Sequence, residues 1–128
     1  MPTPKKSRRS RAKVAGHAPM DQAQLDAAAE LFAVLSEPSR LRILQVLQAG
    51  PESVGELGEK LSMKQANVSK QLGILQAAGV VSRRQEGNRA IYGIALPMVF
   101  DLCKLVCRGI AELAAQRAKA LQGAIARR

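Results

Sequence analysis

Residues Ser62–Leu75 constrain the fold of this chain more than any other stretch, because they read as a short helix with one apolar and one polar side. Ser62 is predicted to cap the N-terminus of this helix, since Gln65 follows three residues later, as a capping box requires. Four apolar residues are predicted to anchor its inner side, namely Ala66, Val68, Leu72 and Leu75.

The opposite side of the predicted helix is polar and carries no carboxylate. Amide side chains pair with adenine edges, lysine with guanine or phosphate, and serine with either. We therefore predict that this helix lies in the major groove of DNA, the alternative being a solvated face without a partner. The residues predicted to contact DNA from this helix are Lys64, Gln65, Asn67, Val68, Ser69, Lys70 and Gln71.

The segments before this helix predict three further helices. Asp21–Leu35 repeats apolar residues at helical spacing, and Pro38 is favourable in the first turn of a second apolar helix, which a Gly-Pro pair ends. Ser53 and Glu56 form a second capping box, which opens a short helix. Two short capped helices joined by a tight turn are the layout of a helix-turn-helix.

The pattern changes after Gly79, where two short stretches read as strands on either side of turn-forming residues. Val80–Gln85 and Ala90–Ile94 are the predicted strands, and Glu86–Arg89 is the predicted turn. A basic hairpin directly after a helix-turn-helix is predicted to be a wing that touches phosphate or the minor groove, the alternative being a solvated hairpin. The wing residues predicted to contact DNA are Arg83, Arg84, Asn88 and Arg89.

Pro97 is predicted to start a helix that runs to about Ala126 with a wide apolar stripe. This helix is longer than one small domain needs, so a partner is implied. The simplest partner is a second copy joined through the first and last helices, and such a C2 dimer would place two recognition helices on the half-sites of a palindrome. The predicted fold class is mainly α with a β-hairpin wing, a winged helix-turn-helix over residues 21–126.

The net charge of +10 favours a polyanionic partner, nucleic acid first and an anionic membrane surface second. Residues 1–20 are basic and nearly free of large apolar side chains, which predicts a disordered tail that either adds phosphate contacts or only solubilises the chain. The tail contains His17, the only histidine. No apolar run approaches 18 residues, so no membrane span is expected. Two cysteines without a disulfide framework favour a reducing cytoplasm.

Three sets of residues together resemble the ArsR/SmtB family of bacterial winged-helix repressors. Leu35–Leu44 is similar to the family's second-helix motif, Leu-x-x-Pro-x-Arg-Leu-x-Ile-Leu. Asn67–Leu72, followed by Leu75, is similar to the family's recognition helix, and Gly79–Val81 with Arg84–Tyr92 is similar to its wing. The resemblance implies a homodimer that sits on its own operator, double-stranded DNA, and leaves when an effector binds.

The resemblance leaves the effector open, because the family's metal ligands are mostly missing from this sequence. Arsenic, cadmium or lead sensors of the family often carry Cys-x-Cys in the helix before the recognition helix, whereas Ser53–Leu57 has no thiol. Asp101–Cys103 resembles half of the family's zinc site, with Cys in place of His. Ala114 and Arg117 stand where the other half would be, and neither binds zinc, so a zinc site of that type is not expected.

Cys103 and Cys107 are four residues apart on one predicted helix, so their side chains share a face. Four thiols from two chains would gather near a dimer axis, where they would hold a soft metal or metalloid ion or oxidise to a disulfide or persulfide-type bridge. Lys104 and Arg108 flank the pair and are expected to favour the thiolate. The alternative is that both cysteines are small hydrophobic residues.

Two functions are alternatives to an effector-released repressor. One is a constitutive regulator that senses nothing, and another is a basic architectural protein that binds all DNA alike through its tail and charge. A specific regulator instead binds its operator about 10³-fold or more tightly than random DNA. An enzyme is not expected, because the sequence has no phosphate-cradling glycine loop and no histidine in its predicted folded part.

Overall fold

The computed structural model describes residues 18–127. The predicted basic tail at 1–20, with His17, therefore lies almost entirely outside the described residues. The chain divides into two units, residues 1–37 and residues 38–128.

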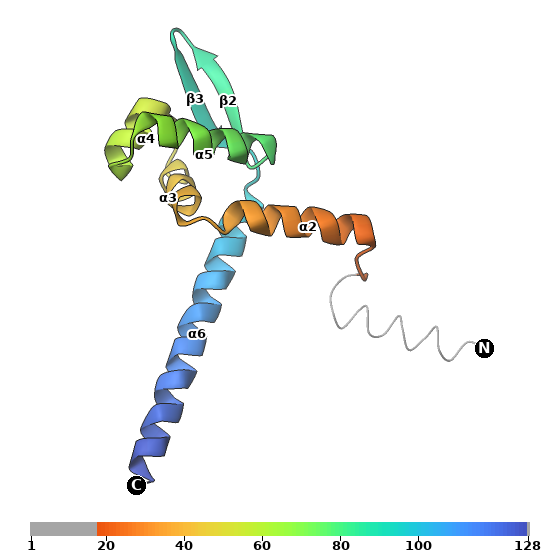
Figure 1. Cartoon of the computed structure of the whole chain (residues 1–128), viewed down its shortest axis with the longest axis vertical. Helices are drawn as coiled ribbons and strands as arrows, with labels where there is room; N and C mark the ends of the chain where they lie inside the picture. Colours follow the sequence, from red (N-terminus) through yellow and green to blue (C-terminus); the bar gives the residue numbers. More distant parts are fainter. Residues whose placement is uncertain (1–17, 128) are drawn as a thin grey trace, which may run out of the picture. The chain divides into compact units, whose positions relative to one another are not determined.

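Helix α2, Gln22–Leu35, lies in the described part of the first unit (Figure 1). The Asp21 carboxylate accepts a hydrogen bond from the Gln24 backbone N–H at 2.8 Å, and the Gln24 side chain accepts one from the Asp21 N–H at 2.9 Å. This reciprocal pair satisfies two of the donors at the helix start. Leu25 and Phe32 expose 48% and 57% of their surface, so the apolar side of α2 is largely uncovered.

The second unit begins with α3, Pro38–Leu47, whose proline occupies the first helical turn as predicted. A short strand β1, Glu52–Ser53, leads into α4, Val54–Leu61, and α5, Gln65–Ala77, follows after a turn. Figure 1 shows α4 and α5 side by side. This pair confirms the predicted helix-turn-helix.

The turn between α4 and α5 differs from the predicted one. Ser62 does not cap α5 but ends α4 in the left-handed conformation, with φ at +53°, whereas an N-cap needs an extended backbone. Lys64 precedes α5 and makes no side-chain capping bond. The Met63 N–H closes the end of α4 by donating to the Gly58 carbonyl at 2.9 Å. A Cβ on Gly58 would lie only 2.9 Å from the carbonyl oxygen of Met63, so the tight turn requires glycine at position 58.

Strands β2, Val81–Glu86, and β3, Arg89–Ile94, form the predicted hairpin with bounds shifted by about one residue. Glu86 pairs with Arg89 across the turn, where Gly87 takes a φ of +61° that glycine adopts without strain. Strand β1 pairs with the other edge of β3, which gives the order β1-β3-β2. The sequence did not predict β1, because two residues are too short to show an alternating pattern.

The core of the second unit is aliphatic, as the 2% aromatic content requires. Its best-buried side chains come from α3, α4, α5, the hairpin and the start of the last helix. Those with at most 2% of their surface exposed are Ile43, Leu44, Leu57, Val68, Leu72, Leu75, Val80, Val81 and Val99. Packing of α3 and the hairpin against α4 and α5 therefore holds the helix-turn-helix in a fixed geometry.

Helix α6, Met98–Ala126, follows Pro97 as predicted. Val99 is its only buried residue. The large apolar side chains that α6 leaves exposed are Met98, Leu105, Val106, Ile110, Leu113, Leu121 and Ile125. None of the helices within residues 18–127 is long and apolar enough to cross a bilayer.

Candidate nucleic-acid interface

The outward surface of α5 offers donors and acceptors but no negative charge. Five of the seven residues predicted to contact DNA from this helix are exposed, and they are Lys64, Gln65, Asn67, Ser69 and Lys70. Neither α5 nor its N-cap contains an acidic residue. Amide, hydroxyl and ammonium groups thus face outward from a helix whose other side is fixed in the core.

Two predicted orientations on α5 are wrong. Val68 was predicted both to help anchor the helix and to contact DNA. It is fully buried and anchors α5 with Leu72 and Leu75, so the predicted DNA contact is wrong. Ala66 is exposed, although it was predicted to face inward. Both follow from helix geometry, because Val68, Leu72 and Leu75 recur at spacings of four and three, whereas Ala66 lies about 200° around the axis from Val68.

Gln71 was also predicted to face DNA, but it is buried, with 8% of its surface exposed. Its side-chain oxygen accepts a hydrogen bond from Arg40 Nε at 2.8 Å, and its Nε2 donates to Asn67 Oδ1 at 3.0 Å. Gln71 follows Val68 by three residues and therefore lies on the inward stripe of α5. The pairing of both its polar ends explains how an amide is tolerated there.

Two arginines of α3 support the helix-turn-helix through contacts that the sequence did not predict. Arg40 reaches Gln71 of α5, and Arg42 Nη2 donates to the Leu61 carbonyl at 2.8 Å, where α4 ends. A cation at a helix C-terminus donates to a carbonyl that has no partner within the helix. It also interacts favourably with the negative end of the helix dipole. The signal was visible as an Arg-Leu-Arg sequence inside an otherwise apolar helix.

The hairpin carries the predicted basic residues on its surface. Arg83, Arg84, Asn88 and Arg89 are all exposed. Arg83 donates to Gln85 at 3.1 Å, and Arg84 contacts the Glu86 carboxylate at 2.6 Å. Exposed ion pairs contribute only about 0–1 kcal/mol, so these guanidinium groups can exchange a carboxylate for a phosphate at small cost.

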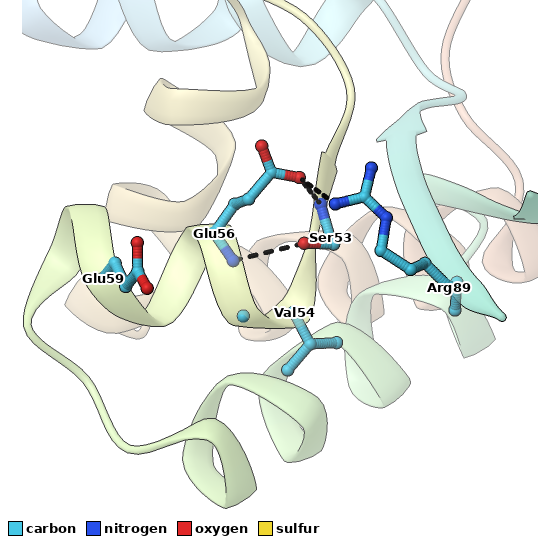
Figure 2. Close-up of a pocket in the computed structure, with 7 residues that line it drawn as sticks. Ser53, Val54, Glu56, Glu59 and Arg89 are labelled. Carbon is cyan, nitrogen blue, oxygen red and sulfur yellow. Dashed lines mark hydrogen bonds and ion pairs between the residues drawn. The ribbon is translucent and has the colours of Figure 1, made fainter.

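Arg89, beside the turn of the hairpin, joins the start of β3 to the start of α4. The predicted capping box is present, because the Ser53 hydroxyl accepts from the Glu56 N–H and the Glu56 carboxylate accepts from the Ser53 N–H, each at 3.2 Å. Arg89 Nη1 lies 3.5 Å from the same carboxylate oxygen (Figure 2). The hydrogen bonds from Ser53, helped by Arg89, hold the pKa of Glu56 below its usual value.

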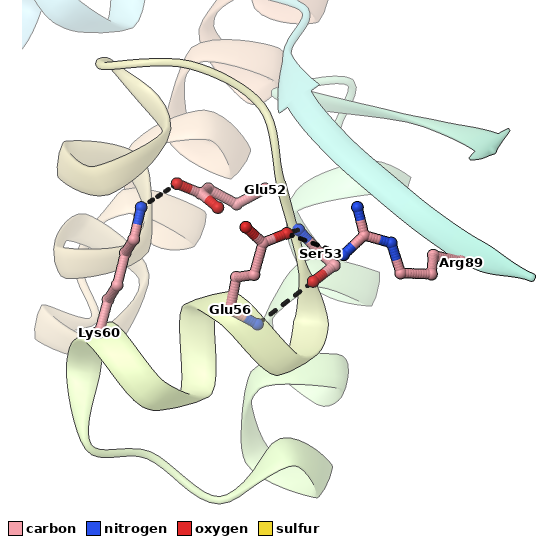
Figure 3. A network of polar contacts seen from close by, with 5 residues as sticks. All are labelled: Glu52, Ser53, Glu56, Lys60 and Arg89. Atoms are coloured by element: carbon pink, nitrogen blue, oxygen red, sulfur yellow. Dashed lines mark hydrogen bonds and ion pairs between the residues drawn. The ribbon is translucent and has the colours of Figure 1, made fainter.

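A second ion pair lies beside this one. Lys60 contacts Glu52 of β1, and this hydrogen bond raises the pKa of Lys60 (Figure 3). An open pocket of about 410 Å³ at the start of α4 is lined by Glu56, Glu59 and Arg89 among others. Because two carboxylates oppose one guanidinium, the pocket is poorly suited to an anion, and its ionic contacts mainly connect α4 to the sheet.

Cys103 and Cys107 lie in a different place, along a cavity of about 380 Å³ between α3 and α6. Burial raises the pKa of the Cys103 thiol, and Cys107 adds to this effect. The expectation that flanking cations favour the thiolate is therefore wrong for Cys103. Within residues 18–127, no three His, Cys, Asp or Glu side chains of one chain gather as a metal site would require.

Comparison with known families and proteins identifies relatives of the helix-turn-helix and its surroundings. A family model described as a helix-turn-helix domain matches residues 35–84. Rv0081 of Mycobacterium tuberculosis, an HTH-type transcriptional regulator, is 39% identical over 95 residues, which span 73% of this chain and 83% of that protein. Its crystal structure matches with a TM-score of 0.68 at 36% identity, covering 77% of this chain and 99% of that one.

Two further relatives carry more specific descriptions. The biofilm growth-associated repressor of Agrobacterium fabrum is 42% identical over 65 residues, which span 51% of this chain and 56% of the repressor. The solution structure of Mb0332 from Mycobacterium bovis is that of a homodimeric winged helix-turn-helix DNA-binding domain, a possible ArsR-family regulator. It matches with a TM-score of 0.63 at 32% identity and covers 74% of this chain and 90% of that fragment.

Proposed function

Because the chain belongs to the ArsR/SmtB family of winged helix-turn-helix transcriptional regulators, we propose that it is a homodimeric repressor that binds operator DNA through α5 and the β2–β3 hairpin. Members of this family are DNA-binding regulators and not enzymes, and the chain shares that class. The identity of the DNA-contacting residues, the dimer and the direction of regulation are parts of the proposal.

The outward surface of α5 is the observation that carries the proposal. Asn67, Ser69 and Lys70 are exposed on one helix without any carboxylate, while Val68 and Leu72 fix its other side in the core. A rigid helix with this surface fits the major groove, where amides, hydroxyls and ammonium groups meet base edges and phosphates. Arg83, Arg84 and the turn residue Asn88 would add contacts from the hairpin to the phosphate backbone or the minor groove.

The exposed apolar side of α6 supports the homodimer. Ile110 and Leu121 expose 62% and 63% of their surface, and six further large apolar side chains in this helix and α2 are between 45% and 59% exposed. Exposed apolar side chains in such number are typical of protein interfaces. A relative of this chain, Mb0332, forms a homodimer, and a second copy presenting the same surface would form an isologous contact.

DNA binding is tested by fluorescence anisotropy with a labelled duplex from the promoter upstream of the chain's own gene, in competition with random duplex. We expect a preference of about 10³-fold or more for the promoter. Equal binding to both duplexes would contradict the proposal and favour the non-specific architectural protein. A promoter–reporter assay with and without the protein then separates repression from activation.

We further propose that a thiol-reactive effector releases the repressor through Cys103 and Cys107. Both cysteines line the cavity between α3 and α6, and α3 in turn holds α5 through Arg40. A change at the thiols therefore has a short physical route to the recognition helix. A soft metal or metalloid ion, an oxidant or a persulfide donor has the required chemistry, with the second copy supplying further thiols.

The effector is tested by repeating the anisotropy measurement on reduced and oxidised protein, and with soft ions or persulfide donors. The variant is Cys103→Ser/Cys107→Ser, and Gln48→Ser, which alters the same cavity without a thiol, is its matched control. We expect effectors to release wild type and the control but not the double variant. Equal responses of all three proteins, or no response in any, would leave a constitutive regulator whose cysteines only pack.

A further inference from the structure

The three side chains Arg40, Gln71 and Asn67 form a hydrogen-bonded chain with only one possible direction. A guanidinium has donors but no acceptor, so Arg40 Nε must donate to the oxygen of the Gln71 amide at 2.8 Å. The NH₂ group of Gln71 is then the end that meets Asn67, and it can only donate. Asn67 must therefore offer its oxygen, Oδ1, at 3.0 Å.

This direction determines what Asn67 presents to solvent. Because Oδ1 is held by Gln71, the remaining polar group of Asn67 is its NH₂, which carries two donors. Asn67 is exposed, whereas Gln71 is 8% exposed and cannot easily exchange its partners for water. A buried amide that lost Arg40 or Asn67 would leave a polar atom unpaired, which is unfavourable away from water.

We propose that the Arg40–Gln71–Asn67 chain turns the amide of Asn67 with its donors toward DNA, so that Asn67 selects guanine rather than adenine. Guanine presents two acceptors in the major groove, N7 and O6, whereas adenine places the N6 donor beside its N7 acceptor. An asparagine that is free to offer both its oxygen and its NH₂ pairs with adenine. Its oxygen has a second lone pair, but it is turned toward the buried Gln71, so this asparagine is not oriented to make that pair.

The inference rests on the proposed binding of DNA through α5. Because the Arg40–Gln71–Asn67 hydrogen bonds run in one direction, a substitution that reverses this direction tests the inference. In Gln71→Glu, one carboxylate oxygen still accepts from Arg40, and the other becomes an acceptor facing Asn67. The Asn67 amide must then rotate, so that its NH₂ donates inward and Oδ1 faces DNA. The variant is therefore expected to prefer a base with an exocyclic amino donor, adenine or cytosine, at the same position.

The test is selection of bound duplexes from a randomised library with the full chain as wild type, Asn67→Ala and Gln71→Glu, followed by sequencing. The position that loses its preference in Asn67→Ala is the one that Asn67 reads. At this position we expect wild type to favour guanine over adenine by about tenfold or more, and Gln71→Glu to favour adenine or cytosine. Lys119→Gln, which changes an exposed residue of α6 outside the proposed DNA-binding surface, is expected to keep the guanine preference.

The possible results separate the failure of this inference from that of the proposed function. If wild type selects no sequence, sequence-specific binding itself fails, and the inference fails with it. If wild type selects a site but Gln71→Glu keeps guanine, the direction of the chain does not set the preference. If Asn67→Ala weakens binding to all duplexes equally, Asn67 contacts phosphate and the inference is overturned.

A measurement without DNA guards against a variant that does not fold. In a ¹⁵N-labelled sample, the side-chain NH₂ of Asn67 is expected to exchange rapidly with water in wild type and severalfold more slowly in Gln71→Glu, because only the variant hydrogen-bonds it inside the protein. Protection in wild type would overturn the inference independently of any DNA result. Arg40→Lys, which keeps a donor without an acceptor, is expected to retain the wild-type exchange pattern.

Discussion

Helices α5 and α6 are both amphipathic, but their apolar sides have opposite fates. In α5, Val68, Leu72 and Leu75 are fully buried, so its uncovered side is polar. In α6, only Val99 is buried, and residues such as Ile110 remain uncovered. Figure 1 shows α5 packed among the other elements of the second unit, whereas most of the length of α6 has few neighbours within that unit.

The difference indicates what each helix binds. A polar surface on a rigid helix gains little from covering by another protein but matches the groups of a nucleic acid. An uncovered apolar stripe gains about 25 cal/mol for each Å² removed from water, so it favours a protein partner. This difference supports the proposal that α5 serves recognition and α6 serves assembly.

The largest expected effect is loss of stability on emptying the core behind α5. Leu72→Ala removes a fully buried side chain and is expected to lower the free energy of unfolding by about 2–5 kcal/mol. Gln116→Ala on α6, where the side chain is polar and exposed, is expected to change it by less than about 0.5 kcal/mol. Urea unfolding at one fixed protein concentration measures both, and equal losses would remove the distinction between the two helices.

The next effect concerns assembly. Ile110→Asp places a charge in the exposed stripe of α6 and is expected to weaken the dimer by about 2 kcal/mol or more, roughly 30-fold in Kd. Sedimentation velocity over a dilution series measures the change. Lys119→Asp, about 180° around the helix from Ile110, places the same side chain on the opposite face and is expected to remain dimeric. A wild-type chain that is monomeric at all concentrations would contradict the assigned role of α6.

A smaller effect is expected for a phosphate contact from the hairpin. Arg89→Ala is expected to weaken binding to promoter and random duplex alike and to reduce the slope of log K against log salt by about 1. The charge-conserving control is Arg89→Lys, which should keep the wild-type slope. An unchanged slope in Arg89→Ala would mean that Arg89 serves only its contact with Glu56, 3.5 Å away.

The smallest effect is a pH-dependent contribution of Glu56 to stability. Its pKa is lowered in the folded chain from an ordinary value of 4.5, mainly by the hydrogen bond with the Ser53 hydroxyl. The contribution is therefore present above about pH 4.5 and is lost as the pH falls through the lower folded pKa. Unfolding of wild type and Glu56→Gln should differ slightly at pH 7 and converge as the pH falls below the folded pKa of Glu56. A difference that grows with acid would contradict this assignment.

Features coded by neighbouring residues were determined by the sequence. The Ser53–Glu56 capping box, the proline at the start of α3, the turn at Gly87 and the apolar periodicity of α6 each follow from residues within one or two turns of each other. The family motifs added the order of the helices and the hairpin along the chain. Together they were sufficient to predict the winged helix-turn-helix and the exposed basic hairpin.

The tertiary structure decided what depends on residues far apart in sequence. Ser62 and Gln65 match a capping box, yet the Ser62 backbone is used to end α4. Gln71 looks like an outward amide until Arg40, 31 residues earlier, is seen to hold it inside. A hydrogen bond between distant residues leaves no periodic trace, so only the packing of α3 against α5 reveals which amides face DNA and which groups of those amides are free.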